Sequence, residues 1–181
     1  MNTFLSFFLL SNAVVFYAFG TDGMSALKAK KTVLPTLTAM IFLFTAITSP
    51  AVYAIKTVSA AYLPIVYVGS AALLYLLTLF AARHIGTKLF DAIRPAAHIC
   101  AFNALSFGGA VVITGVAPDY PHLLLYALWW TLGFAAVGVL VLCAADNLNS
   151  EKIPPRFRGL PVLCFFLGAI ALSAEFLSRG R

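Results

Sequence analysis

The chain has 181 residues, of which 62% are hydrophobic and only 10% are Asp, Glu, Lys or Arg. An average soluble domain is about 45–50% apolar and about 25% charged. Six acidic and twelve basic residues are too few to form the charged surface of a soluble domain. The mean hydropathy of +0.97 is likewise that of a strongly apolar chain. The composition therefore excludes a soluble enzyme, a nucleic-acid-binding protein and a disordered chain, and it predicts a membrane protein.

Charged residues divide the chain into six almost uncharged stretches. A transmembrane helix needs about 20 mostly apolar residues, because each residue advances about 1.5 Å through a hydrocarbon core about 30 Å thick. The last stretch is short and spans the core only if Glu175 lies near an interface. We expect an all-α polytopic membrane protein, with one membrane domain over residues 1–181. Its six transmembrane helices are expected at 2–21 (apolar as far as Leu27 except for Asp22), 32–55, 57–82, 95–118, 120–145 and 159–174.

The basic residues are shared unevenly between alternate loops. The loops after the first, third and fifth predicted spans hold nine Lys and Arg residues, whereas the opposite side holds three. In membrane proteins the cytoplasmic loops carry the excess of Lys and Arg. The three basic loops are therefore predicted in the cytoplasm and both termini on the outer side. This distribution accounts for the net charge of +6 without a nucleic-acid partner.

Six spans form two halves of three, and an odd number of spans per half gives the halves opposite orientations in the membrane. We therefore expect two inverted three-helix repeats, over residues 1–91 and 92–181. Inverted repeats place functional sites at their interface, often at broken helices. The first span of each half has an asparagine in its middle, Asn12 or Asn103, followed by two glycines. Because glycine has little preference for a helix, these first helices are expected to be broken.

Two polar residues are predicted at matching depths in the two halves. Asp22 is six residues before the basic residue Lys28, and Cys100 is six residues after Arg94. Six helical residues advance about 9 Å, so both side chains are expected equally far from the cytoplasmic face. Polar groups inside a membrane are costly and are candidates for function. The alternatives are that Asp22 caps a helix beginning at Gly23 and that Cys100 is an ordinary buried packing residue.

Each of the other polar residues in the spans has two interpretations. His98 is a candidate metal or proton ligand, but it lies two residues from Cys100, so on a regular helix the two side chains do not share a face. They converge only if the backbone is unwound. Asn12 and Asn103 either bond neighbouring helices or line an ion path. Glu175 is either an interfacial acid or a carboxylate in that path.

Several motifs occur together along the chain. Ser11-Asn12 precedes Gly20, Cys100 lies early in the fourth span, and Pro154-Pro155-Arg156-Phe157-Arg158-Gly159 leads into the last apolar stretch. Further matching motifs are Leu125-Tyr126-Ala127, Gly133-Phe134, Ala144-Ala145, Leu167-Gly168-Ala169 and Phe176. With six spans and outward termini, the chain resembles the Rnf/Nqr integral membrane subunits from end to end at low identity. Within that family it is most similar to the RnfA/NqrE type.

The resemblance implies a part in electron transfer coupled to sodium or proton movement in a bacterial plasma membrane. In such complexes two sister subunits each contribute two cysteines to an iron–sulfur centre buried between them. By position the second cysteine ligand is Cys100, and the first falls on Asp22, where this sequence has no cysteine. The implied partners are sister membrane subunits, flavin- and ferredoxin-like subunits and the lipid bilayer. The chain alone is not expected to be catalytic.

The acid at position 22 leaves two alternatives open. Thiolates are the usual ligands of iron–sulfur clusters because soft sulfur matches their chemistry. Either the centre persists with Asp22 as one ligand, or the chain is a cluster-free relative. Such a relative would be an assembly scaffold or a small ion or solute transporter subunit, with Asp22 as an ion-binding or proton-carrying carboxylate. A third interpretation is an unrelated six-span permease, against which the motif at 156–159 argues.

Overall fold

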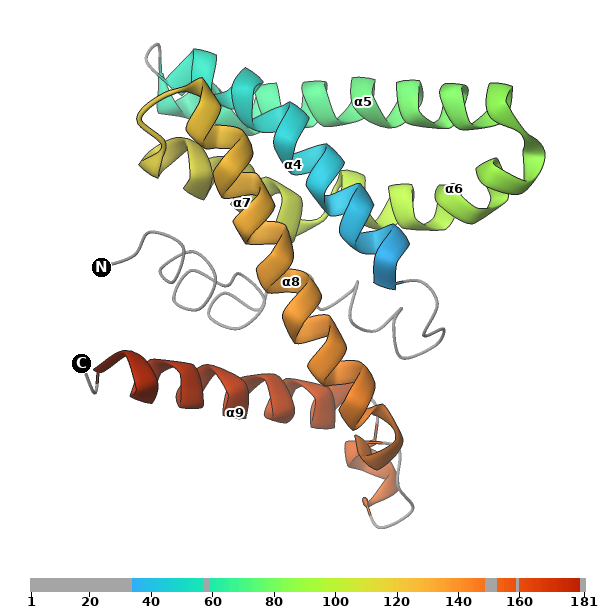
Figure 1. Ribbon diagram of the computed structural model, residues 1–181, viewed down its shortest axis with the longest axis vertical. Coiled ribbons are helices and arrows are strands. Elements are labelled where there is room, and N and C mark those ends of the chain that lie inside the picture. Colours follow the sequence, from blue (N-terminus) through green and yellow to red (C-terminus); the bar gives the residue numbers. More distant parts are fainter. Residues whose placement is uncertain (1–33, 57–58, 149–152, 159, 180–181) are drawn as a thin grey trace.

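The computed structural model describes residues 34–56, 59–148, 153–158 and 160–179 (Figure 1). All regular elements in these ranges are helices, as expected from the sequence. They are α4 (Leu34–Lys56), α5 (Leu63–Ile85), α6 (Thr87–Ala101), α7 (Ala104–Val116), α8 (Tyr120–Leu148) and α9 (Leu160–Arg179). Two short 3₁₀ turns, η3 (Ala60–Tyr62) and η4 (Pro155–Phe157), precede α5 and α9.

Three of these helices, α4, α5 and α8, are long and apolar enough to cross a membrane. α6 and α7 pass the same test as a pair that is bent by 57°, so the described residues contain three or four candidate spans. The spans expected at 32–55, 57–82 and 120–145 therefore correspond to single helices, and the span expected at 95–118 corresponds to the bent pair. The protein is helical and of the membrane type in this part of the chain.

The two outermost predicted spans are not established. The first, 2–21, lies outside the described residues. The last, 159–174, falls on α9, whose apolar part, Pro161–Ile170, is shorter than a membrane span. The number of six spans and the inverted repeats therefore stay predictions.

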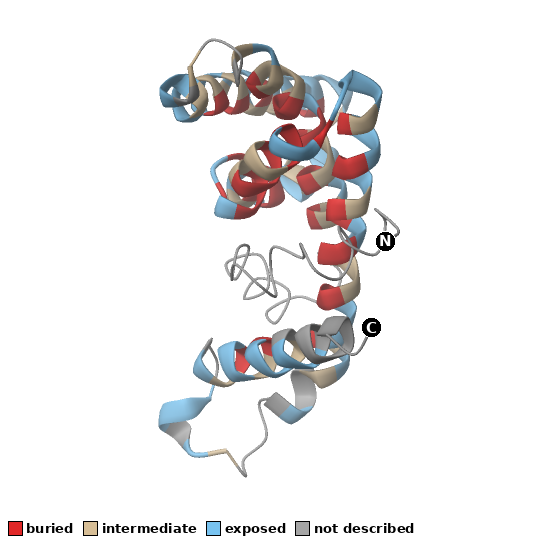
Figure 2. Cartoon of the chain, turned by 90° about the vertical axis from the view of Figure 1, so that its left-hand side faces the viewer, coloured by how far each residue is buried: buried red, intermediate tan, exposed pale blue. Residues whose placement is uncertain are grey.

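Helix α4 is the centre of the bundle because it packs against α5, α6, α7 and α8 (Figure 1). Leu37, Ile41, Phe44 and Val52 of α4 are at most 2% exposed. Buried residues gather where α4, α7 and α8 meet, whereas α9 contacts α8 and has a largely exposed surface (Figure 2). In a membrane protein the exposed apolar side chains of α5 and α9 suit contact with lipid or with another subunit.

One end of the bundle is closed by tyrosines. The hydroxyl of Tyr53 in α4 donates to the carbonyl oxygen of Pro118, in the turn between α7 and α8, at 2.9 Å. The ring of Tyr53 also contacts the ring of Tyr120 edge to face, with 4.9 Å between centroids. Tyrosines are common where helices leave the hydrocarbon, because the ring is apolar and the hydroxyl is polar. These contacts hold the start of α8 against the end of α4.

Asp119 caps the first turn of α8. Its Oδ1 accepts a hydrogen bond from the backbone N–H of His122 at 3.1 Å and also contacts Nδ1 of the His122 ring. The hydrogen bond from the His122 ring, and secondarily the one from its backbone, lowers the pKa of the Asp119 carboxyl below its usual value. Both bonds favour the ionised carboxylate. Asp119 lies between the membrane-crossing helices and is exposed.

The cap predicts a loss of stability in acid. Because the folded pKa of Asp119 is lower than the unfolded value of about 3.9, the carboxylate stabilises the fold above that pH, and the effect is lost as the pH falls through the folded pKa. Asp119→Asn should therefore unfold at a lower temperature than the wild type near neutral pH and should lose less on acidification. Thermal unfolding in detergent over a pH series measures both, with Asp91→Asn, at an exposed acid of α6, as control. An equal acid response of wild type and Asp119→Asn would contradict the lowered pKa of Asp119, because Asn keeps a side-chain oxygen that can cap the helix.

Candidate functional site at the break between α6 and α7

The predicted fourth span is interrupted by a helix break. α6 ends at Ala101 and α7 begins at Ala104, and between them Phe102 (φ −118°, ψ 25°) and Asn103 (φ −85°, ψ 143°) leave the helical conformation. Backbone groups at a break inside a membrane need other partners, because no water reaches them there. The glycines that suggested a break, Gly108 and Gly109, instead lie inside α7 and are buried.

Asn103 accepts hydrogen bonds from two backbone N–H groups in the first turn of α7. Its side-chain Oδ1 accepts a hydrogen bond from the N–H of Leu105 at 2.8 Å, and its carbonyl oxygen accepts one from the N–H of Phe107 at 3.1 Å. Asn103 is 7% exposed, so these bonds form in a buried environment. The sequence predicted either an interhelical bond or an ion path for this residue. The structure shows that its side-chain oxygen is an N-cap, and the interhelical bond and the ion path both stay predictions.

Tyr67 of α5 provides a hydrogen-bond donor for a backbone carbonyl at the end of α6. Its hydroxyl donates to the carbonyl oxygen of Ala101 at 3.1 Å, and its ring packs edge to face on Phe107 with 5.0 Å between centroids. Tyr67 is 3% exposed. Sequence reasoning missed this residue. The available signal was a tyrosine in the interior of a predicted span, whereas membrane tyrosines are enriched at the interfaces.

Three buried polar side chains of the packed helices α4, α7 and α8 have no hydrogen-bond partner in the described part of the chain. They are Thr45 Oγ1, Ser106 Oγ and Trp130 Nε1, and each residue is at most 3% exposed. Ser106 lies in the first turn of α7. Unpaired polar atoms in a protein interior are costly and need an explanation. The interior of the bundle formed by α4, α7 and α8 therefore contains polar atoms that the described residues leave unpaired.

The indole of Trp130 lies directly on α7 at Gly109. A Cβ atom added to Gly109 would lie 2.6 Å from Nε1 of Trp130. Glycine at this position therefore allows α8 to approach the backbone of α7, as small residues do between membrane helices.

Cys100 lies in the last turn of α6, beside the break, and is 1% exposed. Its thiol faces α4, where it donates to the carbonyl oxygen of Leu37 at 3.8 Å. Leu37 is six residues after the basic residue Lys31, and Cys100 is six residues after Arg94. The contact places Cys100 level with Leu37, and the depth of Cys100 in the membrane stays a prediction.

His98 lies on a different face of α6 from Cys100. It is exposed, and the hydroxyl of Tyr75 in α5 lies 2.8 Å from its Nδ1 and 3.1 Å from its Nε2. α6 is a regular helix through both residues. The unwound backbone that would bring His98 to Cys100 is therefore not found in α6.

The described cysteines do not form a ligand set. Cys143 and Cys164 are exposed on α8 and α9, whereas Cys100 is buried and directed at a backbone carbonyl. Among the described residues, no group of three His, Cys, Asp or Glu side chains is placed to hold a metal ion. These residues by themselves do not fit an iron–sulfur centre, which needs several thiolates.

The remaining candidates lie outside the described residues. Asp22 and Asn12 belong to the N-terminal part, and the side chain of Glu175 is not described although its backbone lies in α9. The proximity of Asp22 to Cys100 therefore stays a prediction.

Comparison of the sequence with models of known protein families and with curated proteins finds no match. The Rnf/Nqr resemblance therefore depends on the motifs alone.

The Asn103 cap can be tested by substitution. Asn103→Ala should lower the free energy of unfolding by about 1 kcal/mol, because the buried N–H of Leu105 loses its acceptor. Asn103→Ser keeps a side-chain acceptor and should retain most of the stability. Unfolding by denaturing detergent, followed by circular dichroism, compares the two. Equal losses in both variants would show that the side-chain oxygen does not act as a cap.

The contact between α7 and α8 makes a second prediction. Gly109→Ala should lower the free energy of unfolding by about 1–3 kcal/mol, because the new methyl group overlaps a buried indole that has little room to move. Gly115→Ala, in the same helix with no atom within 4 Å of its added Cβ, is the matched control and should cost nothing. The same unfolding measurement applies. A tolerated Gly109→Ala would mean that α8 does not approach α7 this closely.

Proposed function

We propose that the chain is a membrane subunit of an ion-translocating electron-transport complex of the Rnf/Nqr type, in a bacterial plasma membrane and with both termini outward. One observation carries the proposal. The buried residue Cys100 lies in the last turn of α6, beside a helix break, and it is the residue that the resemblance assigns as a cluster ligand.

The break supplies the ion-handling part of the proposal. The C-terminal end of α6 carries partial negative charge and the N-terminal end of α7 carries partial positive charge. Tyr67 and Asn103 hold these two ends in fixed positions through their hydrogen bonds. The hydroxyl of Ser106 lies in the same turn and has no described partner. Broken membrane helices with such groups are where transporters place ions, so we assign the ion path to this region.

An iron–sulfur centre, if held between this chain and a sister subunit, would supply the electron-transfer chemistry. The described residues contribute a single suitably buried thiol, Cys100, and they do not fit the group by themselves. No electron-transfer step is therefore assigned to them. In the proposal this chain binds and positions its partners, and it does not catalyse a reaction alone.

A second candidate function is favoured by the hydrogen bond of Cys100. A thiol that donates to the carbonyl oxygen of Leu37 is protonated and packed, whereas a cluster ligand is a thiolate directed at iron. This hydrogen bond supports the alternative that the chain is a cluster-free relative that acts as an assembly scaffold or a small ion or solute transporter subunit. Asp22 is then the ion-binding or proton-carrying carboxylate.

Purification from the native membrane distinguishes these functions. We expect the tagged chain, solubilised in mild detergent, to co-purify with a sister membrane subunit and with flavin- and ferredoxin-like subunits, which mass spectrometry identifies. Iron, acid-labile sulfide and the visible absorption spectrum are then measured on the same complex. If the centre is present, Cys100→Ala should remove the iron and the absorption band. Cys143→Ala, at an exposed cysteine of α8, should retain both.

The co-purifying partners and the iron content together distinguish the two candidate functions. An iron-free complex with the expected partners would support the cluster-free alternative. A chain that co-purifies with no redox subunit would contradict the electron-transport assignment in both forms.

A further inference from the structure

Helices α5 and α6 form an antiparallel pair that is joined by the single residue Gly86 (Figure 1). Two contacts fix how the helices lie side by side. The hydroxyl of Tyr67 donates to the carbonyl oxygen of Ala101, and the hydroxyl of Tyr75 lies 2.8 Å from Nδ1 of His98. The end of α5 and the start of α6 therefore form a corner, from which both helices run into the bundle.

Exposed basic residues gather near the corner between α5 and α6. Arg83 is in the last turn of α5, and Lys88 and Arg94 are on α6. Among the residues that the structure describes, none of these three side chains forms an ion pair. Asp91 is the one acid in the sequence of the two helices. The corner therefore has a net positive charge.

The surface of α5 changes along the helix. Four side chains before the corner, Leu73, Leu76, Leu77 and Phe80, are apolar and each at least 55% exposed. Because α5 is long and apolar enough to cross a membrane, these side chains suit contact with acyl chains. The positive charge of the corner begins at Arg83, directly after them. A phospholipid has the same order of groups, since its charged headgroup adjoins its acyl chains.

The exposed face of α6 shows a similar order. Arg94 and His98 lie in α6 and Phe102 directly follows it, at intervals of four residues, so the three lie on one face. All three are exposed, and each interval is about 6 Å along the helix axis. A charged group, a hydrogen-bonding group and an apolar ring therefore follow one another away from the corner. In a diacyl phospholipid the phosphate, the ester carbonyls and the acyl chains follow one another in the same way.

His98 has a hydrogen-bond donor to offer to such a molecule. A neutral imidazole has one acceptor nitrogen and one donor nitrogen. When the hydroxyl of Tyr75 donates to the acceptor, the N–H of the ring remains available, because His98 has no other side-chain partner in the described part of the chain. An exposed N–H is costly in hydrocarbon unless an acceptor meets it. The ester carbonyl of a lipid is an acceptor of this kind.

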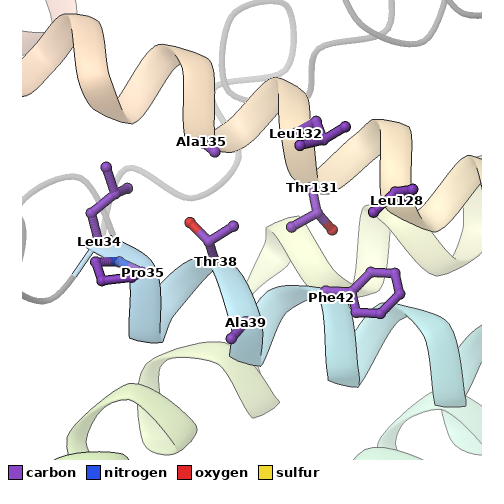
Figure 3. A pocket seen from close by; sticks show the side chains of 9 residues that line it. All are labelled: Leu34, Pro35, Thr38, Ala39, Phe42, Leu128, Thr131, Leu132 and Ala135. Carbon is purple, nitrogen blue, oxygen red and sulfur yellow. The ribbon is translucent and has the colours of Figure 1, made fainter.

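The open groove between α4 and α8, with a volume of about 480 Å³, has a different lining (Figure 3). Its side chains are apolar except for Thr38 and Thr131, and no charged residue lines it. The groove can therefore accept an acyl chain but cannot select a charged headgroup. The corner between α5 and α6 combines positive charge, a hydrogen-bond donor and an apolar surface.

We propose that an anionic phospholipid binds to the α5–α6 face, which consists of Arg83, Lys88, Arg94, Tyr75 and His98. The phosphate lies against the two arginines, the ring N–H of His98 donates to an ester carbonyl, and the acyl chains cover the exposed apolar side chains of α5. Lys88 adds to the electrostatic attraction. A zwitterionic lipid binds less tightly, because its cationic group meets the same basic residues. The inference depends on the membrane class of the protein and not on the proposed function.

Native mass spectrometry of the full chain in mild detergent tests this inference, because it resolves each bound lipid molecule. We expect the first phosphatidylglycerol to bind severalfold more tightly than phosphatidylcholine. Arg83→Gln and Arg94→Gln should each weaken the binding of phosphatidylglycerol about fivefold, because each removes one charge beside an anionic lipid. Asp91→Asn should strengthen it, because it removes the opposing charge. Arg94→Lys keeps the charge and should retain most of the binding.

The matched control for the charge is Arg156→Gln, at an exposed arginine of η4 that the sequence predicts on the same side of the membrane. This substitution should leave the binding of the first phosphatidylglycerol unchanged. An equal loss from Arg156→Gln and Arg94→Gln would show a diffuse attraction and overturn the inference. Equal binding of phosphatidylglycerol and phosphatidylcholine to the wild type would also overturn it. Displacement of the lipid by inorganic phosphate would show that the face takes a free anion instead.

An ether-linked phosphatidylglycerol, which lacks ester carbonyls, tests the role of His98. His98→Leu should weaken binding of the ester-linked lipid about fivefold, through the loss of one hydrogen bond. The ether-linked lipid should bind the wild type and His98→Leu equally. His98→Gln keeps a side-chain N–H and should retain most of the binding of the ester-linked lipid. Equal losses for both lipids in His98→Leu would overturn the placement of the ester at His98.

The lipid measurement and the test of the proposed function can fail separately. The chain is studied without its partners, and neither metal content nor redox activity is measured. Selective lipid binding can therefore be found when no electron-transport subunit co-purifies, and it can be absent when such subunits do.

Discussion

The carbonyl oxygen of Ala101 and the N–H of Leu105 cannot be left unpaired inside a membrane, and the described fold depends on how they are satisfied. One partner comes from α5, through the hydroxyl of Tyr67, and the other from Asn103 at the break itself. These bonds allow the chain to change direction by 57° without water. Because α6 and α7 then diverge, both can pack on α4, and Cys100 is brought against the carbonyl oxygen of Leu37.

Much of the helical organisation could be predicted from the positions of the charges. Long uncharged stretches between lysines, arginines and acids correspond to α4, α5 and α8, because a charged side chain is costly in hydrocarbon. The boundaries were less predictable. The fourth span was expected to begin at residue 95, whereas α6 begins at Thr87 and carries Lys88, Asp91 and Arg94 on exposed positions. A charge limits the hydrocarbon-buried part of a helix and does not end the helix itself.

The site was predicted in part. Counting residues from the nearest basic side chain places Cys100 and Leu37 equally far from Arg94 and Lys31, and the structure brings these two residues into contact. The place of the break did not follow, because glycine was taken as the helix breaker while Gly109 serves helix packing against Trp130. The bond of Tyr67 joins residues 34 positions apart. Such a pairing depends on the tertiary packing of α5 and leaves no local pattern in the sequence.

The position of Trp130 on Gly109 restricts which parts of the bundle can move. An indole that lies against a bare helix backbone opposes sliding of α7 along α8, because this close contact needs the space that a glycine leaves. α6 packs on α4 and α5 and is joined to α5 through Gly86. The contact of Trp130 with Gly109 therefore sets the register in which α7 and α8 pack.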